Sequence, residues 1–85
     1  MKPIQFSAHA NFEIQRRGIS QADAEAVVRN PGQVLPSKKG RHIYQSKLGA
    51  TGQRLLRVIV KEDAMAHHVI PAYKTSKVAK YWKQP

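Results

Sequence analysis

Four side chains that could transfer protons or bind anions fall on one side of a helix predicted over residues 7–18. They belong to His9, Glu13, Arg16 and Arg17. At about 100° per residue they span an arc of about 100°, and apolar residues flank this arc on both sides. An imidazole exchanges protons near neutral pH, and arginine binds phosphate through paired hydrogen bonds. The spacing therefore indicates a helix face that lines a phosphate-binding cleft, with His9 as general acid or base.

A simpler interpretation of the same arc stays open. Glu13 can pair with Arg16 or Arg17 at helical spacing, which is worth about 0.2–0.5 kcal/mol for each pair. His9 is then a half-exposed surface residue with no part in catalysis.

A second concentration of reactive side chains lies in the segment AYKTSKVAKYW, residues 72–82. It holds three lysines, two tyrosines and the single tryptophan, and it contains no acid. Val78 and Trp82, four residues apart on a predicted helix, are expected to pack that helix onto a sheet. The side chains left to face a ligand are Tyr73, Lys74, Lys77 and Tyr81. The segment is therefore expected to form one wall of a phosphate-binding cleft, with the first helix as the other wall.

The charge of the chain is strongly positive. There are 15 Lys and Arg against 5 Asp and Glu, a net charge of +10. Residues 31–85 hold 11 of these bases against Glu62 and Asp63 alone, a net charge of +9. Because such a field attracts phosphate backbones, nucleic acid is the favoured partner class. An acidic protein or an anionic membrane surface comes second.

Length and composition indicate a single folded domain over residues 1–85, with 41% hydrophobic residues. The absence of cysteine excludes disulfides and thiolate metal sites, and it suits a reducing cytoplasm. His67 and His68 are adjacent in a predicted strand and point to opposite faces, which is unsuited to holding one metal ion. We expect no metal site, no cofactor, no signal peptide and no membrane span.

The elements that position these residues follow from local signals. A short strand is predicted at residues 3–6. Ser7 and Ser20 are candidate N-caps of two successive helices, the first ending at Gly18 and the second at the sequence NPG. Alternating apolar and polar residues predict strands at 33–36, 41–47, 54–61 and 66–74.

Two details of the strands and the last helix can be anticipated. Leu56, Val58 and Val60 alternate with polar residues, which indicates a half-buried antiparallel strand. Pro71 cannot donate a hydrogen bond, so its strand is expected to lie at an edge or to contain a bulge. A final helix is expected to begin after Thr75 or Ser76. The predicted fold class is α+β, with an N-terminal helical hairpin, an antiparallel sheet of three to four strands and a short C-terminal helix.

The segments HANFEIQRRGIS, NPGQV, RLLRVIV and VIPAYKTSKVAKYW together resemble a small bacterial family, domain of unknown function 4258. The resemblance covers nearly the whole chain, with the motifs in the expected order. That family is similar to the Barnase–EndoU–Colicin–RelE superfamily of ribonuclease toxins. The resemblance implies helices packed on a curved antiparallel sheet. It also implies a metal-independent endoribonuclease in which the ribose 2′-OH attacks the adjacent phosphate.

Roles for individual residues follow from the resemblance and the arc taken together. The predicted catalytic residues are His9, Arg17, Tyr73 and Lys77. The predicted RNA-binding residues are Arg16, Arg57, Lys74 and Tyr81. Glu13 stands where the family usually has arginine, which lowers the positive charge of the predicted cleft.

Two other functions stay open. The chain could be a non-catalytic nucleic-acid-binding module, whose binding would weaken steeply with salt without any cleavage. It could also be an interaction protein whose basic face docks an acidic partner. The expected partners are RNA, whether tRNA, mRNA or ribosome-bound, and an acidic antitoxin or immunity protein.

Overall fold

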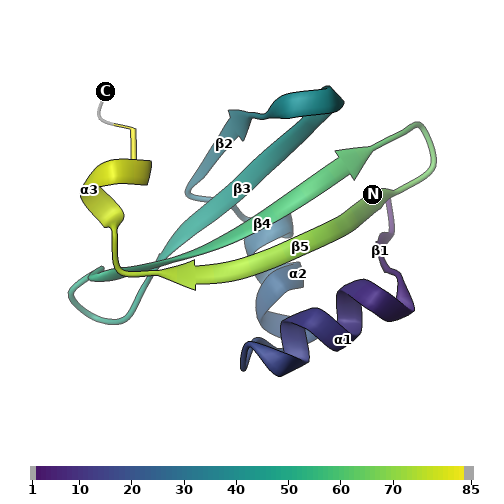
Figure 1. Ribbon diagram of the computed structural model, residues 1–85. Helices are drawn as coiled ribbons and strands as arrows, with labels where there is room; N and C mark the ends of the chain where they lie inside the picture. Colours follow the sequence, from purple (N-terminus) through teal and green to yellow (C-terminus); the bar gives the residue numbers. More distant parts are fainter. Residues whose placement is uncertain (1, 84–85) are drawn as a thin grey trace.

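One sheet carries two helices on one face and a short helix on the other (Figure 1). The computed structural model describes residues 2–83. In chain order the elements are β1 (Ile4–Phe6), α1 (Ala8–Arg16), α2 (Gln21–Arg29), β2 (Gln33–Pro36), η1 (Lys38–Gly40), β3 (Arg41–Leu48), β4 (Arg54–Glu62), β5 (His67–Thr75) and α3 (Val78–Tyr81). The predicted α+β class is confirmed.

Both N-terminal helices begin as predicted. The Ser7 hydroxyl accepts a hydrogen bond from the Ala10 amide, and the Ser20 hydroxyl accepts one from the Asp23 amide. Each hydroxyl satisfies a backbone donor that has no partner within its helix. Gly18, between the helices, has φ of +73°, which glycine adopts without steric cost.

The sheet is larger than predicted and it is mixed. Its order is β1-β5-β4-β3-β2, five strands instead of three or four. β1 pairs with β5 in parallel, whereas the other neighbours are antiparallel. The expectation of a purely antiparallel sheet was therefore wrong. α1 and α2 connect β1 to β2, and this long connection lets β1 lie beside the last strand.

The bulge expected at Pro71 is present, but β5 is an interior strand along its first residues. Val60 pairs with Val69 and Val58 pairs with Ala72, so two residues of β5, Ile70 and Pro71, lie opposite one residue of β4. β1 pairs only with residues 67–69, which leaves residues 72–75 without a strand neighbour on that side.

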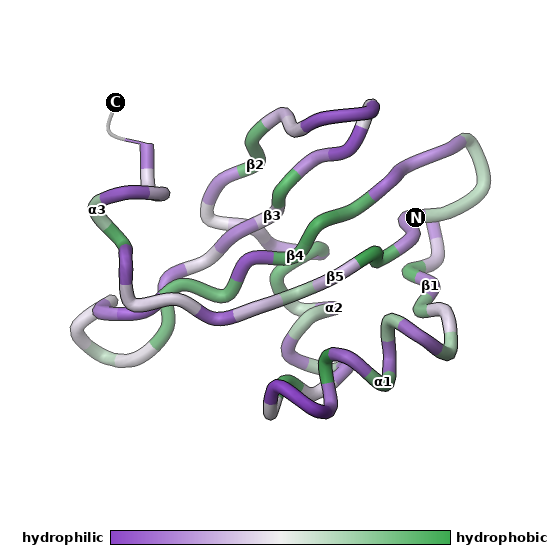
Figure 2. Tube along the Cα trace, in the orientation of Figure 1, coloured by the Kyte–Doolittle hydropathy of each residue, from purple (hydrophilic) through white to green (hydrophobic). Residues whose placement is uncertain are grey.

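The core lies between the helices and one face of β4. Leu56, Val58 and Val60 point toward α1 and α2, where they meet Ile14 and Val27 among other buried residues. Figure 2 shows the corresponding hydrophobic stretch in the middle of β4. Leu55 and Arg57, which alternate with these residues, are also buried although they point away from α1 and α2. The second face of β4 is therefore covered too, and the expectation of a half-buried strand was incomplete.

The last helix is shorter than predicted and has a different N-cap. Thr75 still belongs to β5, and Lys77 is the N-cap residue without a side-chain capping bond. The Thr75 hydroxyl instead accepts a hydrogen bond from the Lys77 amide at 3.1 Å, which shapes the turn into α3.

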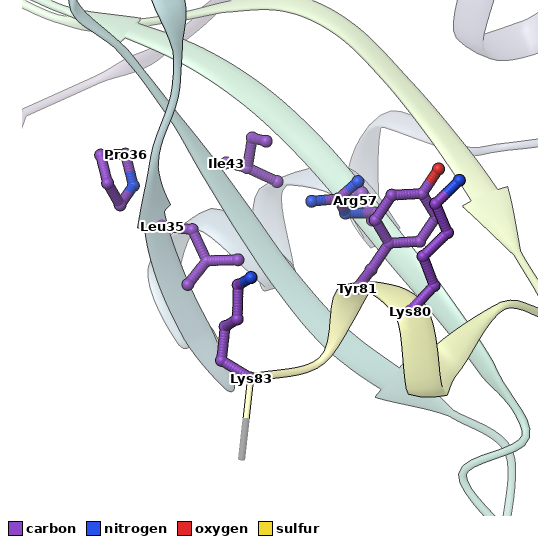
Figure 3. A pocket seen from close by; sticks show the side chains of 7 residues that line it. All are labelled: Leu35, Pro36, Ile43, Arg57, Lys80, Tyr81 and Lys83. Atoms are coloured by element: carbon purple, nitrogen blue, oxygen red, sulfur yellow. The ribbon is translucent and has the colours of Figure 1, made fainter. Parts of the chain in front are cut away.

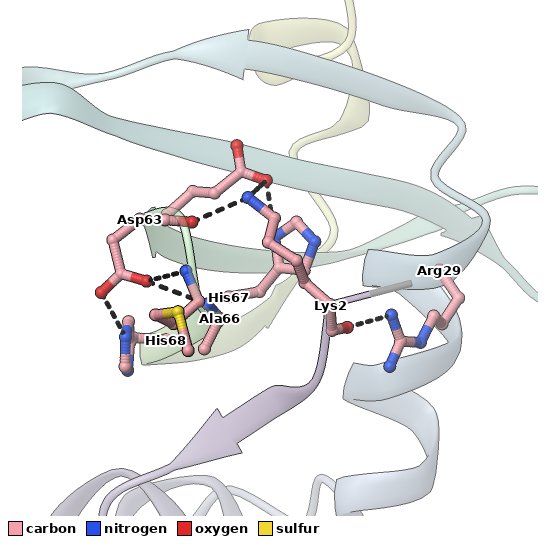
Figure 4. A network of polar contacts seen from close by, with 8 residues as sticks. Lys2, Arg29, Asp63, Ala66, His67 and His68 are labelled. Atoms are coloured by element: carbon pink, nitrogen blue, oxygen red, sulfur yellow. Dashed lines mark hydrogen bonds and ion pairs between the residues drawn. The ribbon is translucent and has the colours of Figure 1, made fainter.

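A polar network closes the end of the β4–β5 hairpin (Figure 4). Asp63 Oδ1 accepts hydrogen bonds from the Met65 and Ala66 amides at 2.8 and 2.9 Å, and its Oδ2 lies 2.9 Å from His68 Nε2. Glu62 Oε1 lies 2.8 Å from Lys2 Nζ. The backbone bond from Met65 lowers the pKa of Asp63, and the bond from Lys2 lowers the pKa of Glu62.

This network predicts a pH-dependent part of the stability. A lowered pKa in the folded state means that the unfolded chain binds protons first as the pH falls. The stabilisation by Asp63 is present above its ordinary pKa of 3.8 and is lost as the pH falls through the lower folded value. Asp63→Asn keeps a side-chain oxygen but not the charge. We expect its melting temperature to lie below that of the wild type at neutral pH, and the difference to shrink in acid. A difference that stays constant in pH-dependent thermal melts would contradict this origin.

Candidate functional site: a buried arginine on the sheet face opposite α1 and α2

Arg57 lies on the face of the sheet opposite α1 and α2, in the middle of β4. Its side chain is 5% exposed. The strand register places Gln45 of β3 on one side of it and Tyr73 of β5 on the other. Arg57 Nε donates to Gln45 Oε1 at 2.9 Å, and Nη1 donates to the Tyr73 hydroxyl at 2.5 Å. These two bonds fix the plane of the guanidinium.

Gln45 is itself fully buried and held in position. Its amide nitrogen donates to Gln33 Oε1 at 2.8 Å and to the Tyr81 carbonyl at 3.1 Å. A buried network with satisfied partners is rigid, since each displacement would leave a polar group without a partner. Gln45 therefore links the position of Arg57 to that of α3.

Two tyrosine rings border the guanidinium. The Arg57 Cζ atom lies 4.1 Å from the ring centroid of Tyr81 and 5.7 Å from that of Tyr73. Both distances fall within the range of cation–π attraction. The structure thus brings together three of the residues predicted for the site: Arg57, Tyr73 and Tyr81.

The positive charge of Arg57 has no negative partner within the described range 2–83. No carboxylate there lies within 4.0 Å of it, and its two side-chain hydrogen bonds go to neutral groups. A buried charge is costly unless it is paired, so this arrangement is suited to an anionic ligand. The N–H groups of Nη2 and the second N–H of Nη1 have no side-chain partner there and are left to bind it.

Arg57 opens onto a pocket of about 390 Å³ (Figure 3). Tyr81 and two further cations, Lys80 and Lys83, line the pocket beside it. Its other wall is apolar and consists of Leu35, Pro36 and Ile43. The candidate site therefore joins a cationic end to an apolar end.

The charged arc of α1 lies elsewhere. Glu13 Oε2 lies 3.1 Å from Arg16 Nη2 and 3.8 Å from Arg17 Nη2, and His9 is exposed. α1 packs against the face of the sheet opposite α3 (Figure 1). The sheet therefore separates α1 from α3, the last part of the closing segment, whereas Ala72 and Lys74 in its first part contact Arg17 and Gly18 at the end of the first helix. The expected cleft between these two walls is not formed by α3 and otherwise stays a prediction. The alternation along a strand predicts which residues share a face of the sheet, but it does not predict which helix packs on that face.

Arg17 and Lys74 meet near the unpaired part of β5. Arg17 Nη1 donates to the Ala72 carbonyl at 2.9 Å, and Lys74 Nζ lies 3.4 Å from the Gly18 carbonyl. Lys77 is exposed in the turn before α3. These three predicted residues thus lie near the end of β5 that carries Tyr73, whereas His9 and Arg16 do not join the Arg57 group.

Sequence reasoning missed six residues of the site, namely Gln45, Lys80, Lys83, Leu35, Pro36 and Ile43. A signal for Arg57 was present, because Arg57 occupies the middle of an alternating apolar series between Leu55 and Ile59. A polar residue in such a series faces the second buried side of a strand.

Within residues 2–83, no group of three or more His, Asp or Glu side chains is arranged to hold a metal ion. None of the helices in that range has the length and apolar character needed to cross a membrane.

Comparison with known proteins agrees with this fold. Over 91% of its length the chain superimposes on the Brucella abortus ribonuclease toxin BrnT, covering 100% of that chain with a TM-score of 0.65 and 22% identity. A likeness at this identity establishes the fold. No curated protein matches the chain significantly. Residues 6–74 match the family described as Domain of unknown function (DUF4258). This match spans most of the chain, which therefore belongs to the DUF4258 family.

Proposed function

We propose that this protein is a toxin-type ribonuclease that binds the scissile phosphate of RNA at Arg57. The observation that carries the proposal is the buried guanidinium without an acidic partner, held by Gln45 and Tyr73 at the edge of a cationic pocket. The fold of a ribonuclease toxin and the net charge of +10 support it. The expected place of action is the cytoplasm.

The reaction is metal-independent transesterification. The 2′-oxygen of a ribose attacks the adjacent phosphorus and gives up its proton to a base. The bond from phosphorus to the 5′-oxygen breaks, and that oxygen takes a proton. The products are a 2′,3′-cyclic phosphate and a 5′-hydroxyl. Arg57 stabilises the negative charge that builds up on the phosphoryl oxygens, as preorganised donors do in other transition states.

Other predicted residues would hold the RNA on either side of the reacting phosphate. Tyr73 shares its hydroxyl with Arg57 and is the nearest group able to donate or accept a proton. Arg17 and Lys74 lie near the unpaired part of β5, where neighbouring phosphates could pass. Lys77 and Arg16 are exposed cations that add to the attraction of the backbone. The same basic surface is the proposed docking site for an acidic antitoxin or immunity protein.

The primary test is incubation of the purified protein with RNA in EDTA. We expect cleavage to continue with the metal chelated and to leave 2′,3′-cyclic phosphate ends, detected by mass spectrometry. Absence of cleavage for tRNA, mRNA and ribosome-bound RNA alike would overturn the proposal. Cleavage that needs an added metal ion would overturn the metal-independent mechanism.

Replacing His9 can be compared directly with replacing Arg57. The two residues lie on opposite faces of the sheet, and one phosphorus atom cannot be contacted from both faces. The catalytic role predicted for His9 stays a prediction, and it competes with a reaction centred on Arg57. We expect His9→Ala to retain cleavage within about threefold, whereas loss of a preorganised donor at Arg57 costs about 10²–10³-fold. If His9→Ala instead loses cleavage and the Arg57 variant retains it, the reacting phosphate must bind at α1 and not at Arg57. Circular dichroism spectra of both variants control for folding.

A non-catalytic nucleic-acid-binding module is the second candidate. The residues found to line the pocket include no histidine or carboxylate, which favours binding without proton transfer. Binding that falls steeply with salt, without cleavage of any RNA tested, would select this candidate.

A further inference from the structure

The pocket beside Arg57 has two chemically different ends. Figure 3 shows Leu35 and Ile43 side by side at one end and Arg57 with Tyr81 at the other. Lys83 also lines the pocket, and in this view its amine ends near Leu35. A ligand that fills this pocket needs an apolar part and an anionic part, connected by a short spacer.

The strand register sets the separation of the two ends. Ile43 pairs with Ile59, and Gln45 pairs with Arg57, so Ile43 and Arg57 are diagonal neighbours on adjacent strands. Such neighbours lie roughly 7–8 Å apart. One nucleotide places a flat, largely apolar base and a phosphate on either side of a single sugar, which suits this separation. The volume of about 390 Å³ lies within the range of roughly 300–1,000 Å³ typical of small-molecule sites.

We propose that the pocket binds an unpaired nucleobase of single-stranded RNA while Arg57 binds the adjacent phosphate. The choice of RNA rests on the proposed function. The base packs on Leu35 and Ile43, and Lys80 and Lys83 attract the flanking phosphates.

This occupant implies selectivity for strandedness and little selectivity for sequence. A base within a duplex is paired and stacked, and it cannot enter the pocket unless it is first extruded from the helix. The side chains at the apolar end, Leu35, Pro36 and Ile43, have no hydrogen-bonding group with which to distinguish one base edge from another.

The test uses 2′-O-methyl oligoribonucleotides, which bind without being cleaved because the attacking hydroxyl is blocked. The salt concentration is chosen to suppress non-specific attraction. We expect the single strand to bind the wild type at least about tenfold more tightly than the same strand in a duplex, because only the single strand can bury a base against the apolar side chains of Leu35 and Ile43. Equal affinity for both forms would overturn the proposal.

A matched pair of variants locates the base. Ile43→Thr removes apolar surface from the pocket and should weaken single-strand binding by about fivefold to tenfold. Ile59→Thr makes the same change in the cross-strand partner of Ile43, which was not found among the lining residues, and should leave binding within about twofold. Equal losses in the two variants would overturn the assignment of the apolar end.

A third measurement needs no variant and so does not depend on the folding of Ile43→Thr. A nucleoside 3′-monophosphate should bind the wild type at least about tenfold more tightly than inorganic phosphate, because only the former buries apolar surface against Leu35 and Ile43. Equal affinities would contradict the proposal. The outcomes also separate the two proposals. Single-strand-selective binding without RNA cleavage supports the proposed base pocket and overturns the proposed ribonuclease activity. RNA cleavage with equal binding of single strands and duplexes supports the ribonuclease activity and overturns the base pocket.

Discussion

Replacement of Arg57 by lysine is expected to lower RNA cleavage by about 10²–10³-fold while the protein stays folded. Lysine keeps the charge but carries it on a single nitrogen, which cannot bond Gln45, Tyr73 and a phosphate in the fixed geometry of a guanidinium. The apolar core between β4 and the helices is untouched. The measurement is the initial rate of cleavage with RNA in excess, together with a circular dichroism spectrum.

Arg54→Lys is the matched control, since Arg54 is exposed near the start of the same strand. Its cleavage rate should stay within about twofold of the wild type, as for most surface changes outside a site. Inorganic phosphate should raise the melting temperature of the wild type and of Arg54→Lys, because a ligand that binds only the folded state stabilises it. The shift should be largely absent in Arg57→Lys. Similar phosphate shifts in all three proteins would show that the anion binds elsewhere.

The helices and most strands could be predicted because their signals are local. Ser7 and Ser20 cap helices whatever the rest of the chain does, and an alternating series such as 54–61 is extended in any sheet. The parallel pairing of β1 with β5 could not be predicted in the same way. It joins residues more than 60 positions apart, and nothing in the sequence Ile4–Phe6 specifies a parallel neighbour.

The composition of the site was predicted better than its arrangement. Arg57, Tyr73 and Tyr81 meet on the face opposite α1 and α2 because the register of β4 and β5 and the turn into α3 bring them there. The face covered by α1 depends on which side of the sheet the chain crosses after β1. A helical arc cannot encode that choice, so the sequence could not show that His9 and Arg16 lie apart from Arg57.

The position of α3 over Arg57 depends on one close contact with a glycine. A Cβ atom on Gly32 would lie 2.8 Å from Cη2 and 3.4 Å from Cζ3 of Trp82, and 3.2 Å from the Gln45 carbonyl oxygen. Trp82 directly follows Tyr81, whose ring lies over Arg57 and whose carbonyl accepts a bond from Gln45. Gly32→Ala should therefore displace Trp82 and move Tyr81 away from Arg57.

We expect Gly32→Ala to lower RNA cleavage about tenfold or more, as small misplacements at reacting groups do. The loss of stability should be only about 1–3 kcal/mol, the usual cost of overpacking. Trp82 is the single tryptophan, so its fluorescence should report the displacement directly. Unchanged fluorescence and unchanged cleavage would mean that this contact does not set the position of α3.

A second substitution should reverse the effect. Phenylalanine is smaller than tryptophan and lacks the Cη2 and Cζ3 atoms that approach Gly32. Gly32→Ala combined with Trp82→Phe therefore has room for the added methyl group. Trp82→Phe alone loses the contact of Lys47 Nζ with the indole, 4.5 Å from its centroid, which is worth about 0.5–1 kcal/mol at an exposed site. We therefore expect the double variant to cleave RNA faster than Gly32→Ala, with a coupling energy of about 1 kcal/mol in a double-mutant cycle. Additive losses would mean that the new methyl group acts through the Gln45 carbonyl and the β3 backbone. The rate of the double variant thus decides whether α3 is positioned by Trp82 or by the sheet beneath it.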